Sequence, residues 1–311
     1  MKNLNYNKKY QIKLFSTYKI SPKLITYSIL FYLLILLFSC SKKQPRNDQK
    51  QHSIRIISLA PSLTETIFYL GKGANLVGRT TECNFPKEAK KIETVGSFGQ
   101  PSLEKVLSLK PDIVVATALA DRNIKQTIEE YGIKFLLLPT DNFQNYKDTL
   151  KTLGNILNCA KLAKQEIRKF NSELKKFQSE NSKKNKIPKV YLEIWNSPYM
   201  TIGKNSFINT MIYYAGGENI FKNVNKGYFN FSLESLIELN PDIIIAPSMR
   251  KGSEIFIKNR PNWNTIKAIK NQNIYTNLNN DLIFRLGPRT ILGIKLLRSI
   301  INNKYTLQNE K

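Results

Sequence analysis

The chain has 311 residues, of which 41% are hydrophobic and 23% are charged, values that fit one or two globular domains and exclude a disordered chain. With one histidine, His52, and three cysteines, it cannot form a multi-histidine zinc site or a disulfide framework, and a histidine-based catalytic triad is disfavoured. The net charge of +25 comes from 38 Lys and 10 Arg spread along the whole chain. We interpret it as dispersed surface charge that attracts anionic surfaces, and not as a nucleic-acid site.

Residues 1–39 have the features of a bacterial signal peptide. They contain six Lys and no acidic residue, and Leu24–Phe38 is an uncharged run shorter than the ~20 residues of a membrane-spanning helix. The run leads into Ser39-Cys40, which resembles the lipobox of lipoproteins. We predict cleavage after residue 39, a lipid on Cys40 and a polar tether over 40–53, so that the folded part is extracytoplasmic; the alternative is an uncut anchor. Losing the six Lys takes the charge from +25 to +19.

From residue 54 onward, short β-branched runs alternate with helical stretches, which predicts an α/β fold with mostly parallel sheets. The predicted strands are Ile54–Leu59, Asn75–Arg79, Asp112–Ala116, Lys134–Leu138, Val190–Ile194, Asp242–Ala246 and Asn273–Thr276. A helix is expected after Pro61, with Ser62 and Glu65 in the spacing of a capping box and Gly71 at its end.

One long helix is predicted over residues 143–182. Leucines such as Leu150, Leu153 and Leu157 recur there at helical spacing, in the longest uninterrupted amphipathic stretch of the chain. This helix separates an N-terminal lobe, 54–142, from a C-terminal lobe, 183–311.

An internal repeat indicates that the two lobes are related. The segment SLEKVLSLKPDIVVA, 102–116, aligns without a gap with SLESLIELNPDIIIA, 232–246, at an offset of 130 residues and with eight of fifteen positions identical. In each copy a serine is expected to cap a short helix, and Pro-Asp to end it before an apolar strand. Two related α/β lobes joined by one helix leave a cleft between them.

Motifs along the whole of 54–303 resemble the substrate-binding lipoproteins of ABC importers for cobalamin, iron-siderophores and haem, and are most similar to cobalamin-binding members. The motifs are RIISLAPSLTETIFYLG (55–71), VGRTTECNFP (77–86), the two repeat copies, GGENIFKN (216–223), RPNWNTIKAIKNQNIY (260–275) and FRLGPR (284–289). The resemblance implies two α/β lobes joined by a backbone helix, a permease with its ATPase as partners, and no enzymatic activity.

The resemblance implies that Glu104 and Glu234, one in each repeat copy, dock into arginine pockets of the permease. Each lies near the expected N-terminus of a helix, where the helix dipole alone favours a carboxylate by ~0.3–1 kcal/mol. On a strongly basic protein, two matched acids would also orient the encounter with a partner.

The cleft is expected to be lined by loops that follow the strands. Those loops offer Pro61, Ser62, Glu82, Phe98, Gln100 and Thr117 in the first lobe, and Trp195, Tyr199, Tyr228, Phe229, Asp281, Phe284 and Arg285 in the second. From this set we predict the ligand-binding residues Phe98, Trp195, Tyr228, Asp281 and Arg285. By resemblance, Glu82 and Thr117 replace aromatic residues of the cobalamin binders.

A corrinoid is the expected ligand, with two alternatives in the same class. A haem receptor would use an axial tyrosine, for which Tyr199 and Tyr228 are candidates. A catecholate siderophore would require several Arg or Lys in the cleft and is disfavoured, because Arg285 is the main candidate there, with Arg250 and Lys251 as further ones. Outside this class, a membrane-anchored hydrolase is disfavoured because Ser62 lacks a G-x-S-x-G turn and a histidine base. An adhesive lipoprotein would not need the two glutamates. No cofactor is expected besides the transported ligand.

Overall fold

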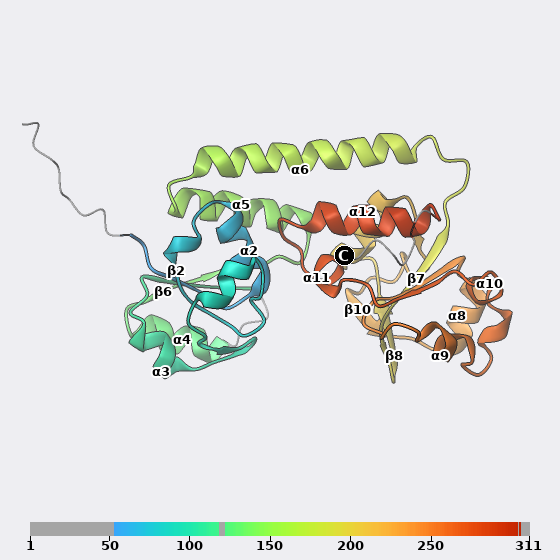
Figure 1. The fold of residues 1–311 in the computed structure, drawn as a ribbon, viewed down its shortest axis with the longest axis horizontal. Coiled ribbons are helices and arrows are strands. Elements are labelled where there is room, and N and C mark those ends of the chain that lie inside the picture. Colours follow the sequence, from blue (N-terminus) through green and yellow to red (C-terminus); the bar gives the residue numbers. More distant parts are fainter. Residues whose placement is uncertain (1–52, 118–121, 304, 306–311) are drawn as a thin grey trace, which may run out of the picture. The chain divides into compact units, whose positions relative to one another are not determined.

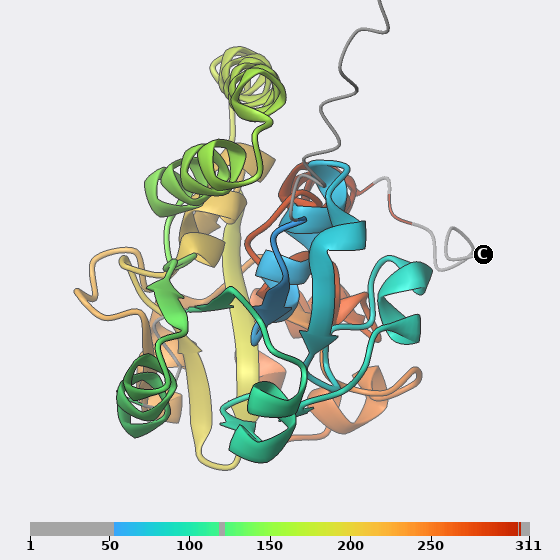
Figure 2. The same cartoon turned by 90° about the vertical axis from the view of Figure 1, so that its left-hand side faces the viewer.

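The computed structural model describes residues 53–117, 122–303 and 305. The predicted signal peptide, Cys40 and the tether up to residue 52 lie outside the described residues. From residue 53 the chain forms two α/β lobes joined by a pair of helices (Figures 1 and 2). In the described part of the chain, no helix combines the length and hydropathy needed to span a membrane.

The first lobe is built on a parallel sheet of four strands in the order β2-β1-β5-β6. Its strands are β1 (Ile56–Ser58), β2 (Leu76–Arg79), β5 (Ile113–Ala116) and β6 (Lys134–Leu137), all inside the predicted ranges. The helices are α2 (Pro61–Tyr69), α3 (Leu103–Ser108) and α4 (Arg122–Glu130), and a small hairpin pairs β3 (Gly96–Ser97) with β4 (Gln100–Pro101). Residues 57 and 114 face one core and residues 56 and 113 another, so both faces of the sheet are covered.

The second lobe has a six-stranded sheet in the order β10-β8-β7-β11-β12, with β9 also paired to β7. Its strands are β7 (Lys189–Asn196), β8 (Tyr199–Ile202), β9 (Glu218–Asn219), β10 (Tyr228–Asn230), β11 (Ile243–Ala246) and β12 (Ile274–Thr276). The helices are α7 (Phe207–Ala215), α8 (Leu233–Leu239), α9 (Glu254–Lys258), α10 (Lys267–Lys270), α11 (Asn280–Phe284) and α12 (Thr290–Ile301). Trp263 is fully buried in its core.

The repeat is confirmed in structure as well as in sequence. The order β2-β1-β5-β6 of the first lobe corresponds to β9-β7-β11-β12 of the second. Ser102 caps α3 by accepting a hydrogen bond from the backbone N–H of Lys105, as Ser232 caps α8 from Ser235. The aspartate that follows each helix also makes the same contact: Asp112 accepts from the backbone N–H of Arg55 at 2.7 Å, and Asp242 from that of Lys189 at 2.9 Å. The second lobe therefore repeats the first and adds the antiparallel strands β8 and β10.

The linking segment corrects one prediction. The single helix expected over 143–182 is two helices, α5 (Phe143–Ile156) and α6 (Ala160–Asn181), and the longer α6 runs over both lobes (Figure 1). The turn occurs because Leu157 ends α5 and Asn158 adopts a left-handed conformation with φ 52°, which asparagine tolerates. Gly154 allows the close approach of the two helices, since a Cβ there would lie 2.5 Å from Ala163 Cβ.

The capping box predicted at the start of α2 is also wrong. Ala60 is the N-cap residue of α2, without a side-chain cap, and Pro61 occupies the first turn. Ser62 instead lies 3.3 Å from Thr140 through their hydroxyl oxygens, and the Glu65 carboxylate binds arginines of the second lobe. Gly71, with φ +69°, follows the end of the helix as expected.

Replacing Gly293 by alanine is expected to destabilise the protein by about 1–3 kcal/mol, although alanine favours an isolated helix by about 1 kcal/mol. Gly293 lies on α12 where that helix packs against α11, and an added Cβ would overlap the carbonyl oxygen of Leu282 and lie 2.6 Å from Met211 Cε. A backbone oxygen cannot move aside as a side chain can. Denaturant unfolding measures the change; Gly287→Ala, whose Cβ would meet no atom closer than 3.7 Å, is the matched control and should be nearly neutral.

Candidate functional site

A cleft of about 600 Å³ opens where loops of the two lobes meet. Its lining combines aromatic rings with small uncharged polar groups and three acidic or basic side chains, Glu82, Asp141 and Arg285. The first lobe contributes Ala60, Pro61, Ser62, Glu82, Phe98, Thr117, Thr140 and Asp141, and the second Asn205, Ser206, Phe207, Gly227, Tyr228, Phe284, Arg285 and Leu286. The volume lies within the range of small-molecule sites in proteins.

The structure brings together eight of the residues that sequence analysis placed around the cleft. These are Pro61, Ser62, Glu82, Phe98, Thr117, Tyr228, Phe284 and Arg285. Five others do not line it: Gln100, Trp195, Tyr199, Phe229 and Asp281. Of the five residues predicted to bind the ligand, Phe98, Tyr228 and Arg285 thus lie in the lining, and Asp281 lies directly behind it as an ion-pair partner of Arg285, 2.8 Å away.

Phe98 is held at the mouth of the cleft by Glu82. The Glu82 carboxylate accepts a hydrogen bond from the backbone N–H of Phe98 at 2.7 Å, between β3 and β4, and leaves the ring 37% exposed. Burial acts to raise the pKa of Glu82, but hydrogen bonds from the Thr81 side chain and from backbone N–H groups outweigh it and lower that pKa. Glu82 is therefore ionised at neutral pH, and it fixes the loop that carries the aromatic ring.

Tyr228 presents the second exposed ring of the cleft. It begins β10, pairs with Ile202 of β8 and keeps 48% of its surface exposed. Partial burial still raises the pKa of the Tyr228 phenol, against a smaller opposing effect of a hydrogen bond with Ser206. The phenol is accordingly protonated at neutral pH and can donate a hydrogen bond.

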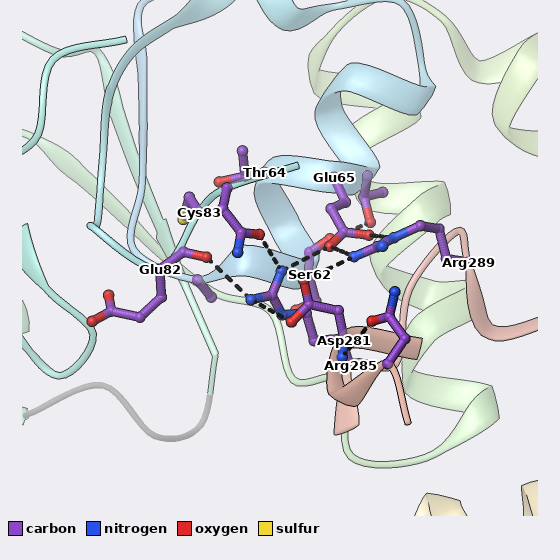
Figure 3. A network of polar contacts seen from close by, with 12 residues as sticks. Ser62, Thr64, Glu65, Glu82, Cys83, Asp281, Arg285 and Arg289 are labelled. Atoms are coloured by element: carbon purple, nitrogen blue, oxygen red, sulfur yellow. Dashed lines mark hydrogen bonds and ion pairs between the residues drawn. The ribbon is translucent and has the colours of Figure 1, made fainter. Parts of the chain in front are cut away.

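Arg285 connects the cleft with a partly buried polar network that joins the two lobes (Figure 3). Its guanidinium donates to Glu65 Oε1 at 3.2 Å, to Asn84 Oδ1 at 2.8 Å and to the carbonyl oxygen of Glu82 at 3.2 Å. Its Nη2 lies 2.8 Å from Asp281 Oδ1. The only cation of the described cleft lining is thus tied to two carboxylates.

Arg289 completes this network from the start of α12. It donates to both Glu65 oxygens, through Nε at 2.7 Å and Nη2 at 2.6 Å, and its guanidinium lies 4.0 Å from the centre of the Phe85 ring. Burial acts to lower the pKa of Arg289, but the hydrogen bonds and the charge of Glu65 raise it. Glu65, Asp281, Arg285 and Arg289 together carry no net charge.

Three aromatic candidates occupy other places. Tyr199 stacks on Phe231, with ring centres 5.9 Å apart, and packs against Trp263 in the core of the second lobe. Phe229 also packs against that core. Trp195 is exposed at the end of β7, where its indole N–H donates to the carbonyl oxygen of Ser197.

Glu104 and Glu234 occupy equivalent positions in the first turns of α3 and α8. Both side chains are exposed, and neither forms an ion pair with another residue described by the structure. Hydrogen bonds from its own backbone N–H and from Ser232 lower the pKa of Glu234, so this acid is charged well below neutral pH.

Cys83 and Cys159 are free thiols, the first buried and the second partly buried. Within the ranges that the structure describes, no group of three or more His, Cys, Asp or Glu side chains is arranged to hold a metal ion.

The sequence pattern of a family described as periplasmic binding protein matches residues 56–279, which is more than half of the chain. The chain belongs to this family. Its two-lobed fold and its cleft are therefore those of an ABC transporter substrate-binding protein, and it is not an enzyme. Substrate-binding proteins of this kind work with a permease and its ATPase, and the relatives are periplasmic or extracytoplasmic.

Three known proteins illustrate the similarity of this periplasmic binding protein to its family. The uncharacterized ABC transporter substrate-binding lipoprotein YvrC of Bacillus subtilis is 33% identical over 84% of this chain and 81% of its own. The vitamin B12-binding protein of Vibrio vulnificus is 26% identical over 84% of this chain and 93% of its own. The structure of Staphylococcus aureus IsdE complexed with heme is 24% identical, covers 80% of this chain and 98% of its own, and superposes with a TM-score of 0.68.

Sequence reasoning missed several residues of the cleft and the partner of Arg285. Thr140 and Asp141 follow β6 and could have been found with the same loop rule that identified the others. Residues 205–207 follow β8, a strand that was not predicted. Glu65 was assigned to a helix cap, and nothing in the local sequence indicates that it pairs with residues more than 200 positions away.

Proposed function

We propose that this substrate-binding protein captures a corrinoid in the cleft and delivers it to a membrane permease. The observation that carries the proposal is the character of the lining: exposed rings of Phe98 and Tyr228, uncharged hydrogen-bonding groups, and one arginine already neutralised by acids. A corrinoid combines an extended, partly apolar ring with many uncharged amides, and such a lining supplies both stacking surface and hydrogen bonds. The similarity to a vitamin B12-binding protein supports the same ligand class.

Haem is the alternative, because the fold is also that of a haem-binding relative. Axial ligation of ferric haem by tyrosine requires a phenolate. Tyr199 is packed into the second-lobe core, and the pKa of Tyr228 is raised by burial. Haem propionates would also need a cation that is free to pair with them. Both considerations favour the corrinoid, and the same charge argument disfavours a trianionic catecholate siderophore.

We further propose that the protein is held at the membrane by a lipid on Cys40, with 1–39 as signal peptide and 40–53 as tether. The mature chain then consists of lobes 54–142 and 183–311 and the linker 143–182. Glu104 and Glu234 are proposed as the permease contacts, one on each lobe.

Replacing Phe98 or Tyr228 by alanine is expected to weaken ligand binding by about 10–100-fold each, since a buried aromatic contact contributes roughly 1.5–3 kcal/mol. Equilibrium titration of the purified variants measures this effect. Phe256→Ala, which removes an exposed ring of α9 outside the cleft lining, is the control and should bind normally. Equal weakening by all three changes would contradict a site at the cleft.

An uptake experiment tests the proposed function in cells. Cells that lack this protein are supplied with labelled cyanocobalamin or with haemin as sole sources of corrinoid and iron. The proposal predicts that corrinoid accumulation at nanomolar supply is lost and that haem use is unchanged. Loss of haem use with normal corrinoid accumulation would contradict the proposal and indicate that the protein serves iron uptake.

A further inference from the structure

The charge of Arg285, the cation of the described cleft lining, is compensated by a residue that does not line the cleft. Arg285 is the one cationic side chain among the described lining residues, and Glu82 and Asp141 are the acids there. Behind Arg285, the Glu65 side chain is only 3% exposed, and it accepts hydrogen bonds from Arg285 and, through both of its oxygens, from Arg289. Glu65 comes from α2 of the first lobe, and both arginines come from the second (Figure 3).

We propose that Glu65 is a selectivity residue of this importer receptor: its carboxylate positions and neutralises Arg285, so that the cleft accepts neutral or cationic chelates and rejects anionic ones. The inference rests on one part of the proposed function, namely that the ligand binds in the cleft. Glu65 acts through Arg285 and is a positioning residue, since it is not part of the lining.

The bonding of Arg285 shows why its charge is not available to a ligand. Its guanidinium is already engaged by Glu65, Asp281, Asn84 and the Glu82 carbonyl, and the side chain is 17% exposed. An anionic ligand would have to displace these partners from Arg285 and would then lie close to the carboxylates of Glu65 and Asp281, whose charges repel it. A neutral ligand can accept a hydrogen bond from the exposed edge without breaking an ion pair.

Removing the charge of Glu65 leaves two arginines against Asp281 alone. The site then has one uncompensated positive charge at the wall of the cleft. A unit charge a few ångströms from a ligand carboxylate, in partly buried surroundings, changes affinity by about tenfold or more. Glu65→Gln is therefore expected to gain affinity for anionic ligands while keeping the shape of the cleft.

The test compares ligands that differ by one charge. Cyanocobalamin, which is neutral, and each of its monocarboxylic acids, made by hydrolysing one propionamide, are titrated into the mature protein in detergent. Wild-type protein should prefer the neutral ligand, and Glu65→Gln should reduce that preference about tenfold. Glu65→Asp, which keeps the charge, should retain the wild-type preference.

A matched control separates charge selectivity from loss of a buried carboxylate. The Glu193 side chain is 2% exposed and accepts two hydrogen bonds from one arginine, Arg260, at 2.5 and 2.9 Å, but neither residue lines the cleft. Glu193→Gln should leave the preference between neutral and charged ligands unchanged. If Glu65→Gln and Glu193→Gln alter it equally, or if neither alters it, the inference is overturned.

Two further measurements keep the inference testable if a step fails. If Glu65→Gln does not fold, Arg285→Gln is the second variant, because it leaves the Glu65–Arg289 pair in place. This variant should reject the monocarboxylates about tenfold more strongly than wild-type protein does. An unchanged preference between neutral and charged ligands would overturn the proposal.

If wild-type protein binds no corrinoid, the proposed ligand is wrong, and titration with inorganic pyrophosphate decides the inference. Pyrophosphate should bind Glu65→Gln about tenfold more tightly than wild-type protein or Glu193→Gln, and equal affinities would overturn it.

Discussion

Reversing the charge at both Glu104 and Glu234 is expected to abolish ligand uptake by cells and to leave ligand binding by the purified protein unchanged. The two acids are exposed in the first turns of equivalent helices, one on each lobe, and form no ion pair within the described part of the chain. They stand out on a mature chain that carries a predicted charge of +19. Opposite charges that meet across an interface steer association and can raise association rates 10–10³-fold, and like charges oppose it.

The double variant Glu104→Lys/Glu234→Lys should reduce uptake by at least two orders of magnitude, with each single variant intermediate. Uptake of labelled ligand at low concentration measures the effect, and calorimetry confirms that the cleft still binds. The control Glu130→Lys/Glu238→Lys makes the same charge change at two exposed acids, one of them a turn further along α8. Normal uptake by the first double variant, or equal loss in the control, would contradict docking through these positions.

Replacing Arg260 by alanine is expected to lower the free energy of unfolding by about 3–5 kcal/mol. Arg260 holds Glu193 by two hydrogen bonds, and the Glu193 side chain is 2% exposed beside the hydroxyl of Tyr191. Arg260 also stacks on Trp263, 4.5 Å from the ring centre. Alanine would leave a buried carboxylate without its partner and remove part of the packing on the ring. For a chain of this size, such a loss lowers the melting temperature by roughly 10 °C.

An exposed pair provides the comparison for this variant. Glu218 and Lys222 form an ion pair at 2.5 Å on the surface, with side chains 34% and 48% exposed. Lys222→Ala should cost no more than about 1 kcal/mol, because solvent screens the pair. Thermal and urea unfolding of both variants measure the contrast. Equal decreases in the free energy of unfolding for Arg260→Ala and Lys222→Ala would show that burial does not increase the contribution of the Glu193–Arg260 pair to stability.

The parts of the fold that sequence analysis predicted are those with a strong local pattern. All seven predicted strands are present, and runs such as β5 and β11 were recognisable because all their residues are apolar and buried on both faces of a sheet. The strands β8 and β10 were missed because they are short and mix polar with aromatic residues. The helix break at Asn158 was missed because apolar residues continue at helical spacing on both sides of it, and the turn depends on one left-handed residue.

The cleft could be predicted only in part, because some of its contacts join segments that are far apart in the sequence. Phe98, Tyr228 and Arg285 were found because their motifs resemble those of a known family and because loops that follow parallel strands gather at one edge. Glu65 was misassigned because its spacing from Ser62 satisfies a local capping rule, whereas its partners Arg285 and Arg289 come from the other lobe. Pairing between distant segments depends on the assembled fold, which local spacing does not encode.

Binding of a corrinoid in the cleft is measured by calorimetric titration of the mature protein with cyanocobalamin, with haemin and a ferric hydroxamate siderophore titrated in parallel. A corrinoid receptor should bind cyanocobalamin saturably and one-to-one with sub-micromolar affinity, and Phe98→Ala and Tyr228→Ala should weaken that binding. Absence of binding heat with cyanocobalamin, together with saturable binding of haemin or of the ferric chelate, would contradict the proposed corrinoid binding.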